Sequence, residues 1–192
     1  MTKFTLSILS GFAFMLLSFT PPKDEVFKVD TEKSSINWTG RKVTGQHSGN
    51  IKIASGQLIY TKKALKSGSF IIDMNSLTCS DSEKVQNHLK TDDFFSVEKN
   101  PVSKFVITNV ANAGTDRVNI TGDLTIKGIT QPLTFPATVK RQGDAIVAVA
   151  KGVKVNRVKY DIKYRSLAFF SNIGDKAIND EFELDVNLLA RR

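Results

Sequence analysis

The sequence predicts an all-β domain, built as a closed antiparallel barrel or as a sandwich of short strands. Apolar and polar residues alternate along most of the chain after residue 26, which is typical of strands with one buried face. Glycine, asparagine and aspartate interrupt these segments at short intervals, as tight turns between antiparallel strands require. The 192 residues, 41% of them hydrophobic, suffice for one domain with a sizeable core, and no linker or internal repeat divides the alternating region.

Eleven alternating segments account for the expected strands. The last is the clearest, because Phe182, Leu184 and two further apolar residues share one face, opposite acidic residues and an asparagine. The expected strands cover residues 27–30, 35–38, 49–53, 57–60, 69–74, 104–107, 118–126, 132–139, 145–155, 158–164 and 181–188. The expected breaks lie at Gly56, Gly68, residues 112–114, Gly128, residues 143–144 and residues 174–175.

One segment departs from this pattern and predicts a short helix. The stretch from Ser80 to Glu83 has the form of a capping box, with Ser80 as the N-cap. Val85 and Leu89 then lie four residues apart on one face, and the helix is expected to end near Lys90. Two phenylalanines follow where the chain must turn back. The helix and this aromatic pair could close one end of a barrel, or the helix could merely cover an open seam.

The first twenty residues have the composition of a secretory signal peptide. A short basic start precedes an apolar stretch, which ends in small residues and a polar run. The apolar stretch is too short and too interrupted for a transmembrane helix; a buried N-terminal helix is the alternative. We therefore expect a signal peptide over residues 1–20, a linker over 21–26 and the β-domain over 27–190. The expected location is the periplasm or the medium, with a soluble protein after cleavage.

The composition argues against several classes of site. Cys79 is the single cysteine, which excludes an internal disulfide, a haem-attachment motif, a zinc ribbon and a thioredoxin motif. His47 and His88 are the only histidines, and a zinc site built on both lacks a third ligand at a useful spacing. We expect neither a metal nor a catalytic residue, because apart from His88 no base is near the Cys79 thiol in sequence.

The chain is basic, with a net charge of +8 and a pI near 9.6. Nucleic acid is not the expected partner, because an exported protein is separated from the nucleic acids of the cell and the sequence has no nucleic-acid recognition motif.

Three motifs occur in order along the chain. Residues 88–101 read H-L-K-T-D-D-F-F-S-V-E-K-N-P, residues 122–132 read G-D-L-T-I-K-G-I-T-Q-P, and residues 156–162 read N-R-V-K-Y-D-I. With these motifs, residues 27–190 resemble the YceI-like family, a lipocalin-like group of exported polyisoprenoid-binding proteins. The chain departs from the family's pattern at Asp161, where glycine is usual, and over residues 45–49 in the early hairpin.

This resemblance implies an eight-stranded, partly extended antiparallel barrel that holds a long isoprenoid or fatty chain in its lumen. A barrel of about eight strands is just wide enough for one slender ligand, or for its own side chains to fill it. Each apolar residue expected inside could therefore equally be plain core packing. The predicted ligand-contacting residues are Trp38, Phe70, Ile72, Phe94, Phe95, Phe105, Ile107, Leu124, Ile126, Phe135, Phe182 and Leu184.

Three polar residues are candidates for contact with a ligand's head group: His47, His88 and Arg157. Arg157 belongs to the basic segment 151–165, which holds six Lys or Arg against one acid, Asp161. This segment could dock anionic head groups or a membrane surface, or be an ordinary solvated strand face. The basic residues expected on one face of the strand are Arg157, Lys159, Lys163 and Arg165.

The function expected from the sequence is non-catalytic binding of a polyisoprenoid or similar lipid, for transport, storage or a stress response. The expected partner is a hydrophobic small molecule, with peripheral contact at a membrane surface; a homodimer is compatible with the sequence. No cofactor is expected beyond a bound isoprenoid lipid or quinone. The alternative is a filled barrel that serves as a protein-interaction or stress-response module through its basic face. An enzyme is disfavoured because no nucleophile and base can be paired.

Overall fold

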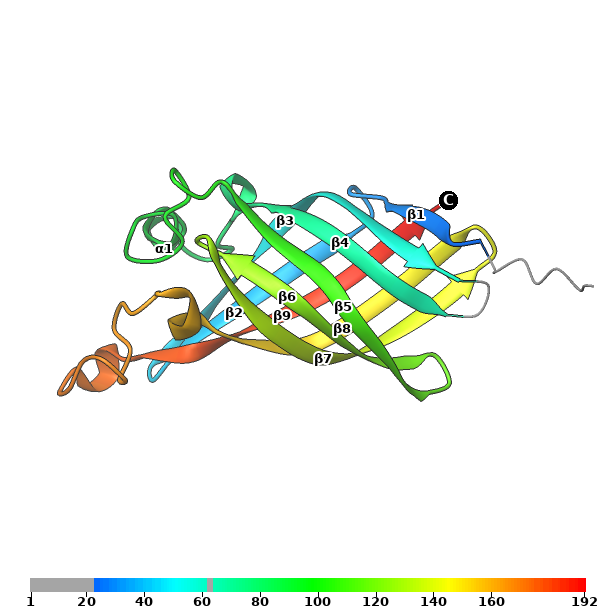
Figure 1. The fold of residues 1–192 in the computed structure, drawn as a ribbon. Coiled ribbons are helices and arrows are strands. Elements are labelled where there is room, and N and C mark those ends of the chain that lie inside the picture. Colours follow the sequence, from blue (N-terminus) through cyan, green and yellow to red (C-terminus); the bar gives the residue numbers. More distant parts are fainter. Residues whose placement is uncertain (1–22, 62–63) are drawn as a thin grey trace, which may run out of the picture.

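The computed structural model describes residues 23–61 and 64–192, which form an antiparallel barrel with one α-helix (Figure 1). The strands are β1 (Glu25–Val29), β2 (Ser35–Lys42), β3 (Gly45–Tyr60), β4 (Leu65–Asp73), β5 (Val102–Gly114), β6 (Arg117–Ile126), β7 (Ile129–Gln142), β8 (Ala145–Asn156) and β9 (Ile178–Arg191). The helices are α1 (Glu83–Leu89) and the short 3-10 helices η1 (Met74–Ser76), η2 (Arg157–Tyr160) and η3 (Gly174–Lys176).

The predicted signal peptide lies outside the described residues. The predicted linker is partly wrong, because β1 begins at Glu25 and takes the linker's last two residues into the sheet.

Eight strand positions close the barrel, because β1 and β2 together fill one of them. The order is β1-β3-β2-β9-β8-β7-β6-β5-β4, and β4 pairs with β3 to complete the ring. β2 pairs with the first part of β3, and β1 pairs with its last part, from Gln57 to Tyr60. β9 also pairs with both. The prediction of an all-β, lipocalin-like antiparallel barrel of about eight strands with one inserted helix is confirmed.

Two glycines predicted to mark breaks, Gly56 and Gly68, lie inside β3 and β4 instead. A Cβ at Gly56 would lie 2.7 Å from the Phe70 ring, and one at Gly68 would lie 2.9 Å from the Leu58 side chain. Neighbouring apolar side chains occupy the space that a Cβ would need. These two glycines therefore serve close packing rather than turns.

One end of the barrel is filled by side chains from paired strands. Phe27 and Ile146 are fully buried there, and Tyr60 packs edge-on against Phe27 with ring centroids 6.2 Å apart. The Arg141 guanidinium lies 5.2 Å from the Phe27 ring centre and donates two hydrogen bonds to Glu25, at 2.6 and 3.1 Å. The ion pair and the ring contacts cover this end of the core, which we call the closed end.

The other end is built largely from irregular chain, and we call it the mouth. α1 and the segment from η2 to η3 lie at this end, beyond the ends of the strands (Figure 1). A second, smaller core cluster joins these segments to the barrel and consists of Phe94, Leu124, Ile126, Val155, Tyr160 and Ile162.

The predicted strand at 158–164 and its basic face are wrong. The Val158 N–H donates to the Asn156 side chain at 3.0 Å at the start of η2, and the helix ends at Asp161 with a φ of +58°. A residue in the left-handed region interrupts an extended strand, so the basic side chains here do not share one face. Two of the apolar residues in this segment, Tyr160 and Ile162, are buried in the second core cluster rather than on a sheet.

The predicted N-cap of the helix is also wrong. The Ser80 N–H donates to the carbonyl of Ser48 on β3 at 2.8 Å, which holds Ser80 beside the strand. Ser82 caps α1 instead, and its Oγ accepts the Val85 N–H at 3.2 Å. The predicted end of the helix at Lys90 is confirmed. In the described part of the chain, no helix has the length and hydropathy needed to cross a bilayer.

Candidate ligand-binding lumen

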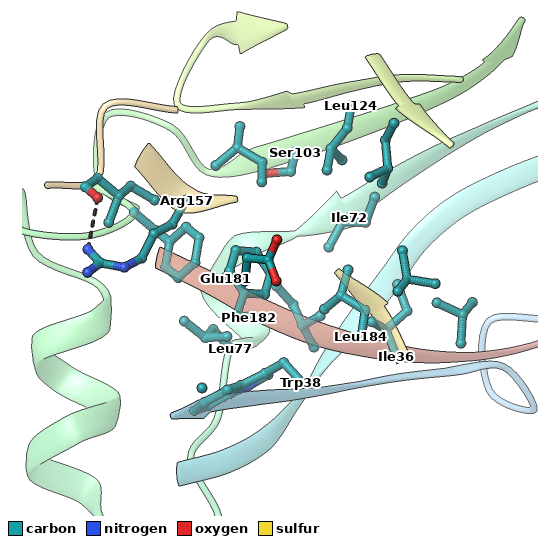
Figure 2. Close-up of a pocket in the computed structure, with 18 of the residues that line it drawn as sticks. Ile36, Trp38, Ile72, Leu77, Ser103, Leu124, Arg157, Glu181, Phe182 and Leu184 are labelled. Carbon is teal, nitrogen blue, oxygen red and sulfur yellow. Dashed lines mark hydrogen bonds between the residues drawn. The ribbon is translucent and has the colours of Figure 1, made fainter. Parts of the chain in front are cut away.

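A cavity of about 570 Å³ extends from the mouth into the barrel. Figure 2 shows side chains from several strands around it, including Trp38 of β2, Ile72 of β4, Leu124 of β6 and Leu184 of β9. Pockets that take small molecules have volumes of about 300–1,000 Å³. The barrel therefore has an internal space large enough for a ligand and is not filled by its own side chains.

All twelve residues predicted to contact an apolar ligand line this cavity. Strand alternation directs nine of them inward from β2, β4, β5, β6, β7 and β9, because every second side chain of a strand faces the same side of the sheet. Phe94 and Phe95 come from the loop after α1, and Ile126 ends β6. The twelve are Trp38, Phe70, Ile72, Phe94, Phe95, Phe105, Ile107, Leu124, Ile126, Phe135, Phe182 and Leu184. Their contact with a ligand stays a prediction.

Small side chains on two neighbouring strands leave the space open. Ala137 on β7 and Ala148 and Ala150 on β8 line the cavity, and all three are buried. A leucine or phenylalanine at these positions would extend into the lumen. Sequence reasoning overlooked these alanines, although Ala148 and Ala150 lie on the inward face of a strand that was predicted correctly.

Aromatic rings form one wall of the lumen. Phe105 lies between Phe70 and Phe135, with centroid distances of 6.4 and 5.7 Å. Gly122 on the adjacent strand makes room for this arrangement, since a Cβ there would lie 2.4 Å from the Phe105 ring. Phe95 and Phe182 meet edge to face at 6.2 Å nearer the mouth.

The polar groups on the lumen wall have partners within the protein. The Trp38 indole N–H donates to the Thr78 carbonyl at 2.9 Å, and the Ser103 hydroxyl donates to the Met74 sulfur at 3.1 Å. Among the described residues, no buried side-chain nitrogen or oxygen lacks a hydrogen-bond partner. The wall therefore favours a ligand part that has no hydrogen-bonding groups of its own.

His47 lines the cavity at the mouth and belongs to a hydrogen-bonded cluster. Its Nδ1 lies 3.1 Å from both carboxylate oxygens of Asp81, and the Cys79 thiol donates to the same carboxylate at 3.0 Å. Burial, followed by the bond to Asp81, raises the pKa of Cys79. The bonds from Cys79 and then from His47 lower the pKa of Asp81.

This cluster differs from the predicted environment of Cys79 in two respects. Asp81 lies between the thiol and the imidazole, so the geometry does not pair a thiolate with a histidine base. Possible metal-ligand atoms of His47, Cys79 and Asp81 lie within 4.8 Å of one another, whereas the zinc site considered from the sequence paired His47 with His88, which is not part of this cluster. The sequence hides this contact, because His47 and Asp81 are 34 residues apart.

His88 on α1 also lines the cavity at the mouth, and it is the first residue of the motif over residues 88–101. Its Nε2 lies 2.7 Å from the Asp93 carboxylate. Its ring meets the rings of Phe94 and Tyr164 edge to face at 5.1 and 4.8 Å. His88 thus joins the helix to the segment after η2.

Arg157 has a structural role that sequence reasoning missed. The side chain is buried at the mouth end of the cavity, and Figure 2 shows its guanidinium hydrogen-bonded away from the apolar wall. Its five N–H groups have five acceptors at 2.9 to 3.4 Å: the carbonyls of Ile162, Tyr164, Ile178 and Asn179, and the carboxylate of Asp180. Burial lowers the pKa of Arg157. With every donor engaged, Arg157 has no N–H left for a head group.

Comparison with known proteins gives a family match over most of the chain. The model of the YceI-like domain matches residues 27–190. Curated relatives named UPF0312 protein include one from Pseudomonas putida, 31% identical over 96 residues, and one from Shewanella denitrificans, 40% identical over 72 residues. These matches span 50% and 38% of this chain and 50% and 37% of the relatives, so they cover half or less of the relatives' length.

Solved structures share the fold at low sequence identity. BcnA of Burkholderia cenocepacia has a TM-score of 0.70 at 22% identity, covering 84% of this chain and 99% of its own. A polyisoprenoid binding domain from Saccharophagus degradans has a TM-score of 0.62 at 15% identity, covering 86% and 97%. The YCEI protein of Campylobacter jejuni has a TM-score of 0.57 at 19% identity, covering 100% and 99%. Likeness at this identity establishes the common barrel.

Proposed function

Because the chain belongs to the YceI-like domain family, we propose that its lumen binds a polyisoprenoid or a similar long apolar chain. The observation that carries this proposal is the cavity itself, which is about 570 Å³ in volume, apolar along its wall, and filled at one end only. A neighbour with the same fold is described as a polyisoprenoid binding domain, which points to the same ligand class.

Burial of hydrocarbon supplies the affinity without any catalytic group. Each methylene moved from water to an apolar site contributes about 0.8 kcal/mol, so a chain of several isoprene units binds well through its length alone. The tail enters toward the closed end, and any head group stays at the mouth, where His47 and His88 lie. An isoprenoid quinone fits the same arrangement as a plain isoprenoid lipid.

The proposed activity is binding rather than catalysis. The thiol of Cys79 is hydrogen-bonded to a carboxylate, and its raised pKa disfavours the nucleophilic thiolate. Transport or storage of a lipid outside the cytoplasm, in the periplasm or the medium, is the role that this proposal assigns to the protein. A membrane is then the place where the ligand is collected and released.

Native mass spectrometry of protein purified from its own host tests the proposal. We expect a hydrophobic adduct at one molecule per chain, lost in Ala150→Phe, which fills the lumen. Val147→Phe is the matched control, because Val147 lies on the same strand with the opposite side-chain direction and is outside the cavity lining. Bare wild-type protein, under conditions that keep lipid in a control lipocalin, would overturn the proposal and favour the protein-interaction module.

A further inference from the structure

Four large apolar side chains are exposed on two segments at the mouth. Val43, at the turn between β2 and β3, is 65% exposed; Leu167, Phe169 and Phe170, between η2 and η3, are 64%, 49% and 46% exposed. Val43 and Leu167 line the same shallow depression next to the start of β9. The two segments therefore present one apolar surface, which we call the mouth rim.

The mouth rim is an ordered part of the fold. Ser166 is fully buried, and its carbonyl accepts the N–H groups of Phe169 and Phe170 at 3.1 and 2.9 Å. The Ile178 N–H donates to the Arg165 carbonyl at 2.9 Å, which joins the segment to β9. Arg157 holds the base of the segment through the carbonyls on either side. The exposed rings thus project from a backbone that hydrogen bonds hold in place.

The mouth rim is also basic. Residues 41–44 and 163–176 contain five Lys or Arg and one Asp, which gives 5 − 1 = +4. Arg41 and Lys163 form ion pairs with Glu183 and Asp161, and with these two acids counted the charge is 4 − 2 = +2. In the described chain, Lys42, Arg165 and Lys176 have no carboxylate within ion-pair distance, and the Lys163 ammonium lies 5.1 Å from the centre of the Phe169 ring. Cations beside exposed aromatic and aliphatic side chains match a bilayer interface, where acyl chains lie beneath anionic phosphates.

The position of the mouth rim relates it to the lumen. Lys42, Arg165 and Lys176 also line the opening of the cavity, so the exposed apolar groups and the entrance to the lumen share one end of the barrel. The turn after β2 and the segment from η2 to η3 both project at the end opposite the C-terminus (Figure 1).

We propose that the mouth rim docks on an anionic lipid bilayer and directs the open lumen toward the membrane. This inference rests on the proposed function, because a docked mouth lets an apolar chain pass between bilayer and lumen with little exposure to water. Leu167, Phe169, Phe170 and Val43 enter the interfacial layer, while the unpaired cations contact lipid phosphates.

Sedimentation with vesicles tests the docking, using phosphatidylcholine alone or mixed with phosphatidylglycerol. Wild type should bind the mixed vesicles roughly tenfold or more tightly than the neutral ones. The double variants Phe169→Ser/Phe170→Ser and Lys42→Glu/Lys176→Glu should each weaken that binding roughly tenfold or more. Matched controls at the closed end are Val26→Ser, which removes a valine that is 46% exposed, and Lys28→Glu; both should bind as wild type does.

Native mass spectrometry of the same preparations separates this inference from the proposed function. An occupied lumen without vesicle binding would overturn the docking and leave the lipid-binding function standing. So would vesicle binding by both double variants that equals that of wild type. An empty lumen with vesicle binding lost in the rim variants would overturn the function and support the docking. A concentration-dependent dimer that the phenylalanine variant abolishes, without vesicle binding, would assign the rim to a second copy and overturn the proposal.

Discussion

The closed end and the mouth of the barrel each hold an arginine in a different way. Arg141 at the closed end pairs with the Glu25 carboxylate and lies 5.2 and 5.6 Å from the ring centres of Phe27 and Tyr60. Arg157 at the mouth donates to four backbone carbonyls, two in the irregular segment after η2 and two at the start of β9. One arginine completes a side-chain core, and the other replaces missing backbone partners.

The difference follows from how each end satisfies its backbone. The backbone N–H and C=O groups of paired strands hydrogen-bond to one another, so at the closed end no side chain is needed to satisfy them and the side chains form the core. The irregular segments at the mouth lack strand pairing, and Arg157 supplies a donor to carbonyls there and at the start of β9. The mouth is therefore expected to open locally at a lower free energy than the closed end, which suits the proposed binding of a ligand in the lumen.

The largest expected effect is a loss of stability at the filled closed end, compared with a smaller loss at the wall of the lumen. Phe27→Ala should lower the free energy of unfolding by about 3–5 kcal/mol, because the ring is fully buried and its loss leaves a void. Phe135→Ala should cost about half as much, because that ring already borders empty space and loses fewer contacts. Urea unfolding measures both. Equal losses would contradict the distinction between the closed end and the lumen.

Removal of the mouth arginine should have the next largest effect. Arg157→Met leaves four backbone carbonyls without their donor and should lower stability by about 3 kcal/mol. Hydrogen exchange should accelerate over residues 157–178 while β1 and β7 stay protected. Lys154→Met is the control, since Lys154 is exposed on β8 and should change little. Uniform exchange throughout the barrel would show that the mouth is not a separate unit.

A smaller effect is expected where the lumen depends on one glycine. Gly122→Ala would place a Cβ 2.4 Å from the Phe105 ring and push that ring into the lumen, at a cost of about 1–3 kcal/mol. The fraction of lipid-bound protein should fall with it in native mass spectrometry. Gly40→Ala is the control for the clash, because Gly40 also lines the cavity but a Cβ there meets its nearest atom at 3.8 Å. Retained binding in Gly122→Ala would place the ligand elsewhere.

The smallest expected effect is a pH dependence confined to the mouth. Burial raises the pKa of Tyr160 to about 12 from its ordinary value of 10.0. The folded state holds the Tyr160 hydroxyl proton more tightly than the unfolded state does. The contribution of this group to the free energy of unfolding is therefore complete below about pH 10 and is lost as the pH rises toward about 12. Stability should therefore fall less with rising pH in Tyr160→Phe than in wild type, measured as the difference between the urea midpoints at about pH 9 and about pH 11. The same loss of stability in Tyr160→Phe and in wild type would show that other groups cause the pH dependence.

Strand alternation was enough to identify the lumen wall. Phe182 and Leu184 face inward because the period of a strand is two residues, whatever the neighbouring strand is. The same rule misled at 158–164, where Tyr160 and Ile162 are buried by a helical turn and a left-handed Asp161. Apolar residues two apart are compatible with both structures, and only the packing of the mouth distinguishes them.

The sequence by itself determined the fold class, the inserted helix and the inward-facing residues, because these depend on local periodicity and on motifs within single segments. The tertiary structure decided whether the lumen is open, because that depends on the width of the closed ring against the volume of small residues such as Ala148 and Ala150. It also decided the partners of Arg157 and the contact of His47 with Asp81, which form only when distant segments meet. Periodicity belongs to a single strand, whereas a cavity and its mouth arise only from the closure of all of them.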